Sequence, residues 1–546
     1  MPQTDIPAAA PSGAPAAPRH ERLNTRAATV VALAVFCSRI LGLIRDQVFS
    51  ALFGAGEVMD AFNMAFRIPN LLRDMFAEGA LSVAFVTTFT KTTALEGERA
   101  AWELANKIAT LATVVLSVLV LIGIACAPWI VAVIAPGFHG EKAALTVELT
   151  RIMYPFILLV SLSALVMGML NARNVFGMPA TASSFFNLGS ILAGAGLGWW
   201  FDPHFGPRAT VGLALGTLIG GALQFAVQLP SLHRLGYRFR PDLHWRDRGV
   251  RSILRLMGPS VIAASSTQLN VLVNGVFASE LGNGRVTWLQ YAFRLIYLPL
   301  GIFGVALGTV TLPLLARMAA GGNTEGFRTE LARGMRLTFL MTIPASIGLI
   351  LLAEPIVSVL FQHGRFTPYE AMQTAAALRF YAIGLCGYAA LKVLVNAFYA
   401  IDRRKTPMVV SFCAVGLNLL LSWLFTVHLG WGHEGLAFST SCVATTNFLV
   451  LYLLMRSHLG RLESRAMLRL LVRIAVASAL LAALCWGGNR YLLAEAALMH
   501  FWAKLGALVL VIAAGAGAFF WCATVLGIHE MQEIGGTLRR RLRRSV

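Results

Sequence analysis

The sequence has little charge for its length. Only 13% of its 546 residues are Asp, Glu, Lys or Arg, whereas 57% are hydrophobic. Soluble domains are usually about a quarter charged, so this composition excludes a soluble protein of this size. Apolar runs of about 20 residues recur along the chain and are long enough to cross a bilayer as helices. The sequence therefore predicts an all-α polytopic membrane protein.

Residues that bind metals or catalyse reactions lack the spacing that such sites need. The seven cysteines lie within apolar stretches, which favours buried small side chains. The eleven histidines fall in loops or near the ends of apolar runs, and the sequence has no phosphate-binding glycine loop. The loops are too short to hold a soluble catalytic domain. We therefore expect a chain that is not an enzyme and that has no metal site and no cofactor.

Hydropathy and helix breakers divide the chain into about fourteen spans. They lie near residues 27–53, 58–90, 104–135, 143–171, 178–200, 209–230, 252–281, 286–315, 335–361, 368–400, 407–428, 434–455, 470–493 and 501–527. Residues 1–25 are rich in Ala and Pro and lack an apolar core. They predict a disordered tail and no cleavable signal peptide.

Lysine and arginine are distributed unevenly between alternate loops. Most of the 45 lie in the two tails, in a basic connector and in loops on the same predicted side. The loops of the opposite side hold Lys142, Arg208, Arg285, Arg365 and Arg490. The positive-inside rule then places both termini in the cytoplasm. It also accounts for the net charge of +19 without a nucleic-acid partner.

Two motifs recur about 225 residues apart, which indicates a duplicated unit. Ala65-Phe66-Arg67-Ile68 returns as Ala292-Phe293-Arg294-Leu295, and Asn171-Ala172 returns as Asn396-Ala397. Six predicted spans separate the copies, so the halves have the same orientation and form two six-helix lobes. The predicted units are a tail (1–25), an N-lobe (26–232), the basic connector (233–250), a C-lobe (251–458), two further helices (464–528) and a basic tail (529–546).

Several cations lie inside predicted spans, where an isolated charge costs about 2.5–3.5 kcal/mol on insertion scales. They are Arg39, Arg45, Arg67, Arg73, Arg151, Arg294, Arg379, Lys392, Arg473 and Lys504. Arg151, Arg473 and Lys504 are close enough to span ends to reach the interface. The others need a partner or a hydrated cavity.

The first two spans combine such cations with acids. Arg39 and Asp46 are seven residues apart and share a helix face, and Arg45 lies to one side. The second span carries Asp60, Arg67, Arg73, Asp74 and Glu78 around Pro69. The proline predicts a kink or break at its own position. Internal ion pairs that hold a lobe together are the alternative to a substrate site in both spans.

The second half has cations without nearby acids. Arg294 is followed by Pro299 and has no carboxylate in its span, and Lys392 is flanked by apolar residues. For Lys392, a position in the cavity and a contact within the lobe are equally consistent with the sequence. The acids near the deep cations all lie in the first half, so we expect a positively charged space between the lobes. Arginine suits phosphate oxygens, which indicates a phosphorylated amphiphile or an organic anion as substrate.

Several motifs resemble those of a known family. They are SRILGLIRD, GAGEVMDAFNMAFRIPNLLRDMFAEGALS, APGF, LNARNVFGMPA, GVALGTVTLPLLA and KTP. The chain after residue 26 resembles the MurJ (MviN) lipid II flippases of the multidrug/oligosaccharidyl-lipid/polysaccharide exporter superfamily. This resemblance implies a MATE-like fold of fourteen helices, in which two lobes enclose a cationic cavity and the last two helices form a groove for a polyprenyl tail.

The resemblance also implies a function. Such a flippase moves the undecaprenyl-diphosphate-linked disaccharide-peptide from the inner to the outer leaflet of the bacterial inner membrane, for peptidoglycan synthesis. The expected partners are lipid II, membrane lipids and cell-wall synthesis proteins. Residues that match the family's motifs, together with the deep lysine, form the expected substrate site: Arg39, Arg45, Asp46, Asp60, Asn70, Arg73, Glu78, Arg294 and Lys392.

The chain departs from some relatives. Phe293 stands where some have an acid, and Asp74 where others have a second arginine. The span at 252–279 lacks the acid of the sodium site found in some members, so the coupling ion stays open. The alternatives are a flippase for another polyprenyl-diphosphate-linked oligosaccharide and a drug antiporter, which needs an acidic cavity. A membrane enzyme would need paired acids or histidines, and a scaffold would need no unpaired deep arginine.

Overall fold

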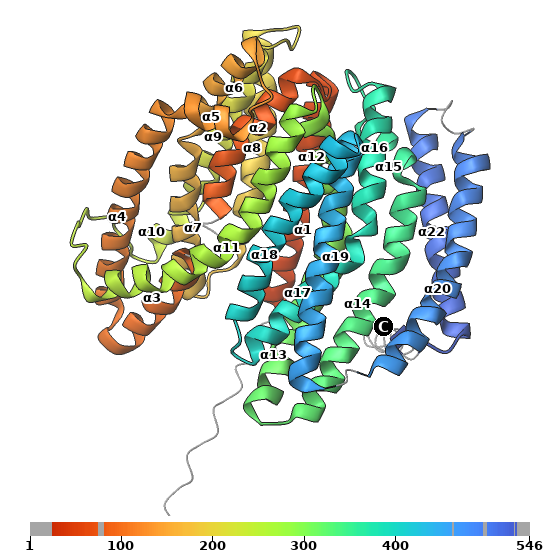
Figure 1. The fold of residues 1–546 in the computed structure, drawn as a ribbon. Helices are drawn as coiled ribbons and strands as arrows, with labels where there is room; N and C mark the ends of the chain where they lie inside the picture. Colours follow the sequence, from red (N-terminus) through yellow and green to blue (C-terminus); the bar gives the residue numbers. More distant parts are fainter. Residues whose placement is uncertain (1–24, 75–80, 461–462, 495–499, 529, 532–546) are drawn as a thin grey trace, which may run out of the picture.

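The computed structural model describes residues 25–74, 81–460, 463–494, 500–528 and 530–531, and these residues contain helices and no strands (Figure 1). The first half contains α1 (Thr25–Phe53), α2 (Glu57–Leu72), α3 (Ser82–Glu96), α4 (Glu98–Ala125), α5 (Ala127–Ile134), α6 (Gly140–Met153), α7 (Phe156–Ala172), α8 (Gly177–Phe201), α9 (Ala209–Ala226) and α10 (Leu229–Arg234). The second half contains α11 (Arg248–Glu280), α12 (Arg285–Pro299), η2 (Leu300–Val305), α13 (Ala306–Ala320), α14 (Thr324–Leu351), α15 (Ala353–Phe361), α16 (Pro368–Ile383), α17 (Leu385–Ala400), α18 (Lys405–Trp423), η3 (Leu424–His428) and α19 (Gly432–Leu459). Then follow α20 (Ser464–Gly487), η4 (Gly488–Leu493) and α22 (Phe501–Val525).

The order of elements in the first half returns in the second. A long helix (α1, α11) precedes an interrupted pair (α2 and α3, α12 and α13) and a long helix that continues into a short one (α4 and α5, α14 and α15). Another interrupted pair and two further long helices follow in each half. The helices α20 and α22 stand at one edge of the molecule, next to α14 and α15 (Figure 1). The element order thus follows the spacing of the repeated sequence motifs.

The apolar composition leads to the expected helical membrane fold. Within the described ranges, nine helical segments are long and apolar enough to cross a membrane, and the bent pair of α16 and α17 adds a tenth. The helices α1 and α11 carry several arginines and are not among these segments. The all-α class is therefore confirmed, whereas the number of fourteen spans stays a prediction.

The prolines of the two interrupted pairs stand at different distances before the change in helix type. Pro69 lies inside α2, which continues to Leu72 and then into π-helical geometry at Arg73, so the predicted break at the proline is wrong, whereas the predicted kink stays a prediction. In the second half, Pro299 is the last residue of α12, and the π-helical segment η2 follows it. π-Helical segments are rare and frequently mark functional sites. The backbone of the second half is therefore irregular directly after the turn that carries Arg294.

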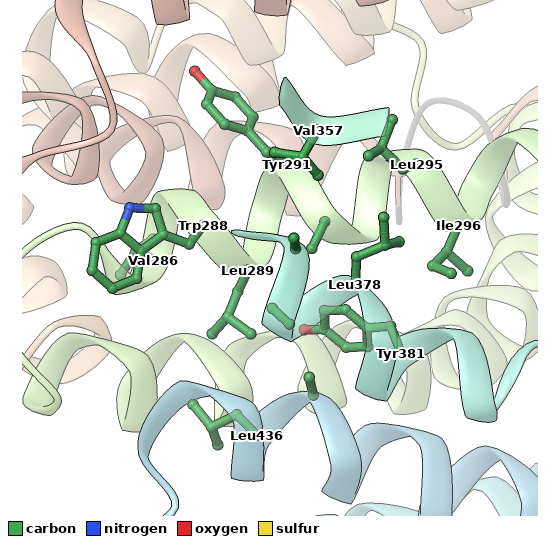
Figure 2. Packing of buried hydrophobic residues seen from close by; sticks show 14 of the residues in the cluster. Val286, Trp288, Leu289, Tyr291, Leu295, Ile296, Val357, Leu378, Tyr381 and Leu436 are labelled. Atoms are coloured by element: carbon green, nitrogen blue, oxygen red, sulfur yellow. The ribbon is translucent and has the colours of Figure 1, made fainter. Parts of the chain in front are cut away.

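The two ends of the bundle differ in charge, and we name them accordingly. The basic end carries the loops at 235–247, 321–323 and 401–404, and the non-basic end carries those at 54–56, 135–139, 202–208, 281–284 and 362–367. The largest buried cluster surrounds α12, which packs against α15, α16 and α19 (Figure 2). Ala55, Met64 and Ile134 of the first half join this cluster. The halves therefore share an apolar core near the non-basic end.

Glycines allow α8 and α9 to pack with their backbones in contact. A β-carbon at Gly216 would overlap the Gly194 backbone, and one at Gly212 would overlap the backbone of Gly198. Small residues that let helix backbones approach closely are typical of membrane helix pairs, because lipid offers no hydrophobic force to bring helices together. By contrast, a β-carbon added at Gly196 of α8 would point into open space.

These contacts lead to a matched pair of variants. Gly216→Ala should lower the free energy of unfolding by about 1–3 kcal/mol, because the added methyl forces two backbones apart. Gly196→Ala should leave it unchanged or raise it slightly. The apparent Tm of each purified variant in detergent measures the effect. Equal Tm values for the two variants would contradict the close packing of α8 on α9.

Candidate substrate-binding site

The charged face of α1 forms a network with α8. The Arg45 guanidinium donates to Asp46 through Nε at 3.3 Å and through Nη2 at 3.0 Å. Its Nη1 donates to the Asn187 side-chain oxygen of α8 at 3.2 Å. Asn187 is held in place because its own amide donates to the Ser38 carbonyl at 3.1 Å. The Arg45 side chain is only 14% exposed, so this arginine is oriented by protein partners.

Arg294 of α12 brings the second half into this network. Its Nε lies 2.8 Å from the second Asp46 oxygen, and its side chain is 40% exposed. One carboxylate is thus shared by two guanidinium groups from opposite halves of the chain. Tyr291, one turn before Arg294, is buried, and its ring stacks on Phe361 with centroids 4.8 Å apart. The Tyr291 hydroxyl has no hydrogen-bond partner within the described residues and points away from Tyr381 (Figure 2).

The helix α1 faces α12 and then η2 over two turns. Arg39 lies seven residues before Asp46, and Gly301 lies seven residues after Arg294. A β-carbon at Gly301 would overlap the Arg39 guanidinium, so these two residues are in contact. Arg39 is exposed and forms no hydrogen bond or ion pair in the part of the chain that the structure describes. The facing surfaces therefore hold three guanidinium groups and one carboxylate.

The end of α2 forms a separate charged pair. Arg73 lies 2.7 Å from Asp74, and Gln268 of α11 donates to the other Asp74 oxygen at 3.3 Å. Asn70 is half-buried one turn earlier on the same helix. The predicted site residue Glu78 lies outside the described residues. Arg73 is therefore largely neutralised by its neighbour, as the ion-pair interpretation of this span expected.

Asp60 belongs to a buried junction between the halves. Its carboxylate lies 3.1 Å from Lys142 Nζ and accepts hydrogen bonds from the Gly284 backbone at 2.6 Å and the Thr287 hydroxyl at 2.7 Å. Asp60 is 0% exposed and Lys142 only 6%. Because Lys142 lies in the first turn of α6, its predicted placement in a loop was wrong. The structure does not bring Asp60 to the group around Asp46.

Further hydrogen bonds close the same end. Asn63 donates to the Thr287 hydroxyl at 3.0 Å, and Gln290 donates to Asn63 at 3.0 Å. Nearer the loops, Arg365 donates to the Phe205 carbonyl at 2.8 Å, and Glu370 accepts from the Ala55 backbone at 2.9 Å. These contacts join the two halves near the non-basic end through groups that are fully bonded.

Comparison with known proteins identifies the family of this chain. A family model described as lipid II flippase MurJ matches residues 49–506. The chain belongs to the MurJ family. The lipid II flippase MurJ of Burkholderia cenocepacia is 36% identical to it over 465 residues, which are 84% of this chain and 89% of the relative.

Solved structures show that the fold is shared more widely than the sequence. A lipid II flippase MurJ in an inward closed conformation aligns with a TM-score of 0.73 at 24% identity, over 90% of this chain and 99% of the other. An inward-facing multidrug resistance MATE family transporter of the MOP superfamily aligns with a TM-score of 0.66 at 15% identity, over 80% of this chain and 99% of the other. The MATE-like architecture expected of a MurJ family member is therefore confirmed.

Two residues of this MurJ family member escaped the sequence analysis. Asn187 orients Arg45, and the buried Tyr291 stands one turn from Arg294. A polar residue within an apolar span is expensive unless it has a partner, so the lone Asn187 was a detectable signal. Tyr291 gave no comparable signal, because aromatic residues are common in apolar helices. Lys392 of α17 is exposed, and no ion pair links it to the described part of the chain, so its role stays a prediction.

The predicted span at 252–279, which lacks an acid, forms hydrogen bonds to two other helices through an amide side chain. Asn274 of α11 donates to the Thr440 hydroxyl at 3.0 Å and accepts from Asn418 of α18 at 3.0 Å. Within the described ranges, no group of three or more His, Cys, Asp or Glu side chains could hold a metal ion.

Two hollows of about 400 and 340 Å³ lie away from the group around Asp46, at the α13–α14 turn and between α4 and the connector. The hydrated chamber between the lobes stays a prediction.

The buried junction allows a test by paired variants. Lys142→Met should lower the free energy of unfolding by about 3–5 kcal/mol, because it leaves the buried Asp60 charge without its cation. Adding Asp60→Asn to that variant should recover part of the loss, since the unpaired charge is then absent. Apparent Tm values of the wild type, both single variants and the double variant give the coupling. An unchanged Tm for Lys142→Met would reject the ion pair as a structural element.

Proposed function

We propose that this protein is a flippase for lipid II, moving it from the inner to the outer leaflet of the bacterial inner membrane by alternating access. The observation that carries this proposal is the sharing of Asp46 by Arg45 and Arg294. Family membership supports the substrate class, because relatives are named lipid II flippases. The charge distribution supports the orientation of the protein in the membrane, since the positive-inside rule puts the basic end in the cytoplasm.

The site favours an anion over a cation. Arg39, Arg45 and Arg294 face one carboxylate, so the group has excess positive charge. A diphosphate offers several acceptor oxygens to these guanidinium forks and would compete with Asp46 for Arg294. A cationic drug would meet repulsion at the same place. This argument disfavours the antiporter alternative and leaves the identity of the sugar headgroup to experiment.

The access path follows from which end is closed. The halves are joined near the non-basic end by Asp60, Asn63 and Arg365. The substrate would enter from the basic end, towards which Arg39 lies relative to Asp46 on α1. Binding of diphosphate at Arg294 would loosen the link between α1 and α12, and separation of the non-basic contacts would then open the opposite side. Translocation therefore requires the junction at Asp60 to break and re-form.

The polyprenyl tail needs an apolar path outside the charged group. The helices α20 and α22 expose apolar side chains, among them Val472, Val509 and Trp521. Arg336 of α14 fixes this pair to the second half through ion pairs with Glu463 and Glu530. We assign residues 464–528 to the path of the tail, and residues 26–232 and 251–458 to the two lobes that move.

Loss of one guanidinium should abolish most transport. Arg294→Ala and Arg39→Ala should each slow lipid II translocation by about ten- to a hundredfold, because each removes a charge-assisted bond to diphosphate worth roughly 1.5–3 kcal/mol. Arg379→Ala is the matched control, since Arg379 forms only an exposed pair with Glu354 at 3.5 Å. The assay is transfer of fluorescent lipid II in reconstituted vesicles. Wild-type rates in Arg294→Ala, with an unchanged Tm, would reject the proposed clamp.

Binding measurements distinguish recognition of the diphosphate from recognition of the sugar headgroup. The wild type should bind lipid II at least about tenfold more tightly than a neutral analogue without diphosphate, and Arg294→Ala should lose that preference. Undecaprenyl diphosphate linked to another oligosaccharide is the second probe. Equal affinity and equal transport of this probe would favour the alternative of a broader polyprenyl-diphosphate flippase. Equal affinity for the neutral analogue would contradict an anion site.

A further inference from the structure

The connector between α10 and α11 and the adjoining ends of these two helices expose many arginines without acidic partners. They are Arg234, Arg238, Arg240, Arg246, Arg248, Arg251 and Arg255. No ion pair links their side chains to acids within the described residues. The nearby acids are already engaged, because Asp242 contacts His244 and Asp247 pairs with Lys107 at 2.8 Å. This segment therefore keeps a strong positive charge.

Large apolar side chains stand among these arginines. Phe239, Leu243 and Trp245 are each 53% exposed. The Arg246 guanidinium lies 4.9 Å from the centre of the Trp245 ring. A mixture of basic residues with exposed aromatic and aliphatic ones is typical of segments that lie in the interface of a membrane. We name Arg238, Phe239, Arg240, Leu243, Trp245 and Arg246 the connector surface.

The connector surface is held against α4 and is not a loose loop. The Arg240 backbone donates to the Asn106 side chain at 3.1 Å, and the Asp242 backbone donates to the Thr110 hydroxyl at 3.0 Å. The Lys107–Asp247 pair adds a third attachment. Figure 1 shows the chain before α11 running beside α4 at one edge of the molecule. Its position is thus fixed relative to the membrane-crossing part of α4.

The position of the connector surface relative to the membrane follows from the apolar surface of α4. This helix exposes a stripe of apolar side chains: Val114, Val115, Val118, Leu121 and Ile122. The stripe begins four residues after Thr110, which is about 6 Å at 1.5 Å per residue. Trp102 and Tyr237 pack together nearby, with ring centroids 5.3 Å apart, in the buried cluster beneath the connector. The connector surface therefore lies where lipid headgroups begin.

We propose that the connector surface binds the phosphate groups of anionic phospholipids in the leaflet at the basic end. Charge complementarity selects these lipids, because basic residues close to a membrane attract anionic headgroups. The apolar side chains and the depth favour a lipid over an acidic protein, which would leave Phe239, Leu243 and Trp245 in contact with water. Attachment to α4 orders the surface in advance, so lipid binding costs little conformational entropy.

Trp245 reports on this contact directly. The full chain is placed in nanodiscs of phosphatidylcholine that contain either brominated phosphatidylglycerol or brominated phosphatidylcholine at the same mole fraction. The quenching of Trp245 is the wild-type signal minus that of Trp245→Phe. We expect brominated phosphatidylglycerol to quench it at least about twofold more strongly, because anionic lipid is enriched near the arginines. High salt should reduce the ratio towards one.

Variants distinguish the effect of the positive charge on the quenching ratio from the effect of the position of the connector surface. The triple variant Arg238→Gln/Arg240→Gln/Arg246→Gln should bring the ratio to about one, and replacement of the same residues by Lys should preserve it. Arg403→Gln/Arg404→Gln/Lys405→Gln removes three cations from another loop of the basic end and should have no effect. Asn106→Ala keeps every charge but frees the loop, and should lower the ratio. A ratio near one in the wild type would overturn the proposal, as would no quenching by either lipid, which would indicate a soluble partner.

Discussion

The structure depends on one carboxylate that serves two halves of the chain. Asp46 contacts Arg45 of its own helix and Arg294 of α12, whose nearest approaches are 3.0 and 2.8 Å. Without a shared anion, two guanidinium groups at this separation would repel one another. With it, α1 can lie against α12 and bring Arg39 to Gly301. The anion therefore allows the halves to approach at this point, and a ligand with stronger acceptor groups can compete for the same place.

The second junction between the halves has the opposite character. Asp60 is fully buried, and its oxygens are occupied by Lys142, Gly284 and Thr287. Buried and fully bonded groups give a defined closed state, because any partial separation leaves a charge without compensation. Arg294, in contrast, is 40% exposed and can exchange partners at lower cost. The Asp60 junction is suited to closing the molecule, whereas the Asp46–Arg294 contact is suited to responding to a ligand.

Duplication has also given the two halves different chemistry at equivalent positions. Arg67 and Arg294 occupy the same place in the repeated motif. Arg67 donates to the Val271 carbonyl at 2.7 Å and so fixes α2 to α11, whereas Arg294 meets a carboxylate. The backbones, by contrast, change alike, because α2 passes into π-helical geometry at Arg73 and α12 does so at Leu300, which are equivalent positions of the repeat. The symmetry of the repeat therefore sets the framework but not the site.

The sequence by itself determined the membrane class, the repeat and the spans that hold deep charges, because composition and periodicity act within a single helix. It placed Arg39 and Asp46 on one face and marked Arg294 as a cation without an acid in its own span. Only the tertiary structure decided that Asp46 reaches Arg294, that Lys142 neutralises Asp60, and that Asn187 orients Arg45. Helical periodicity gives the direction of a side chain around its own axis, whereas partners on distant helices depend on how those helices pack.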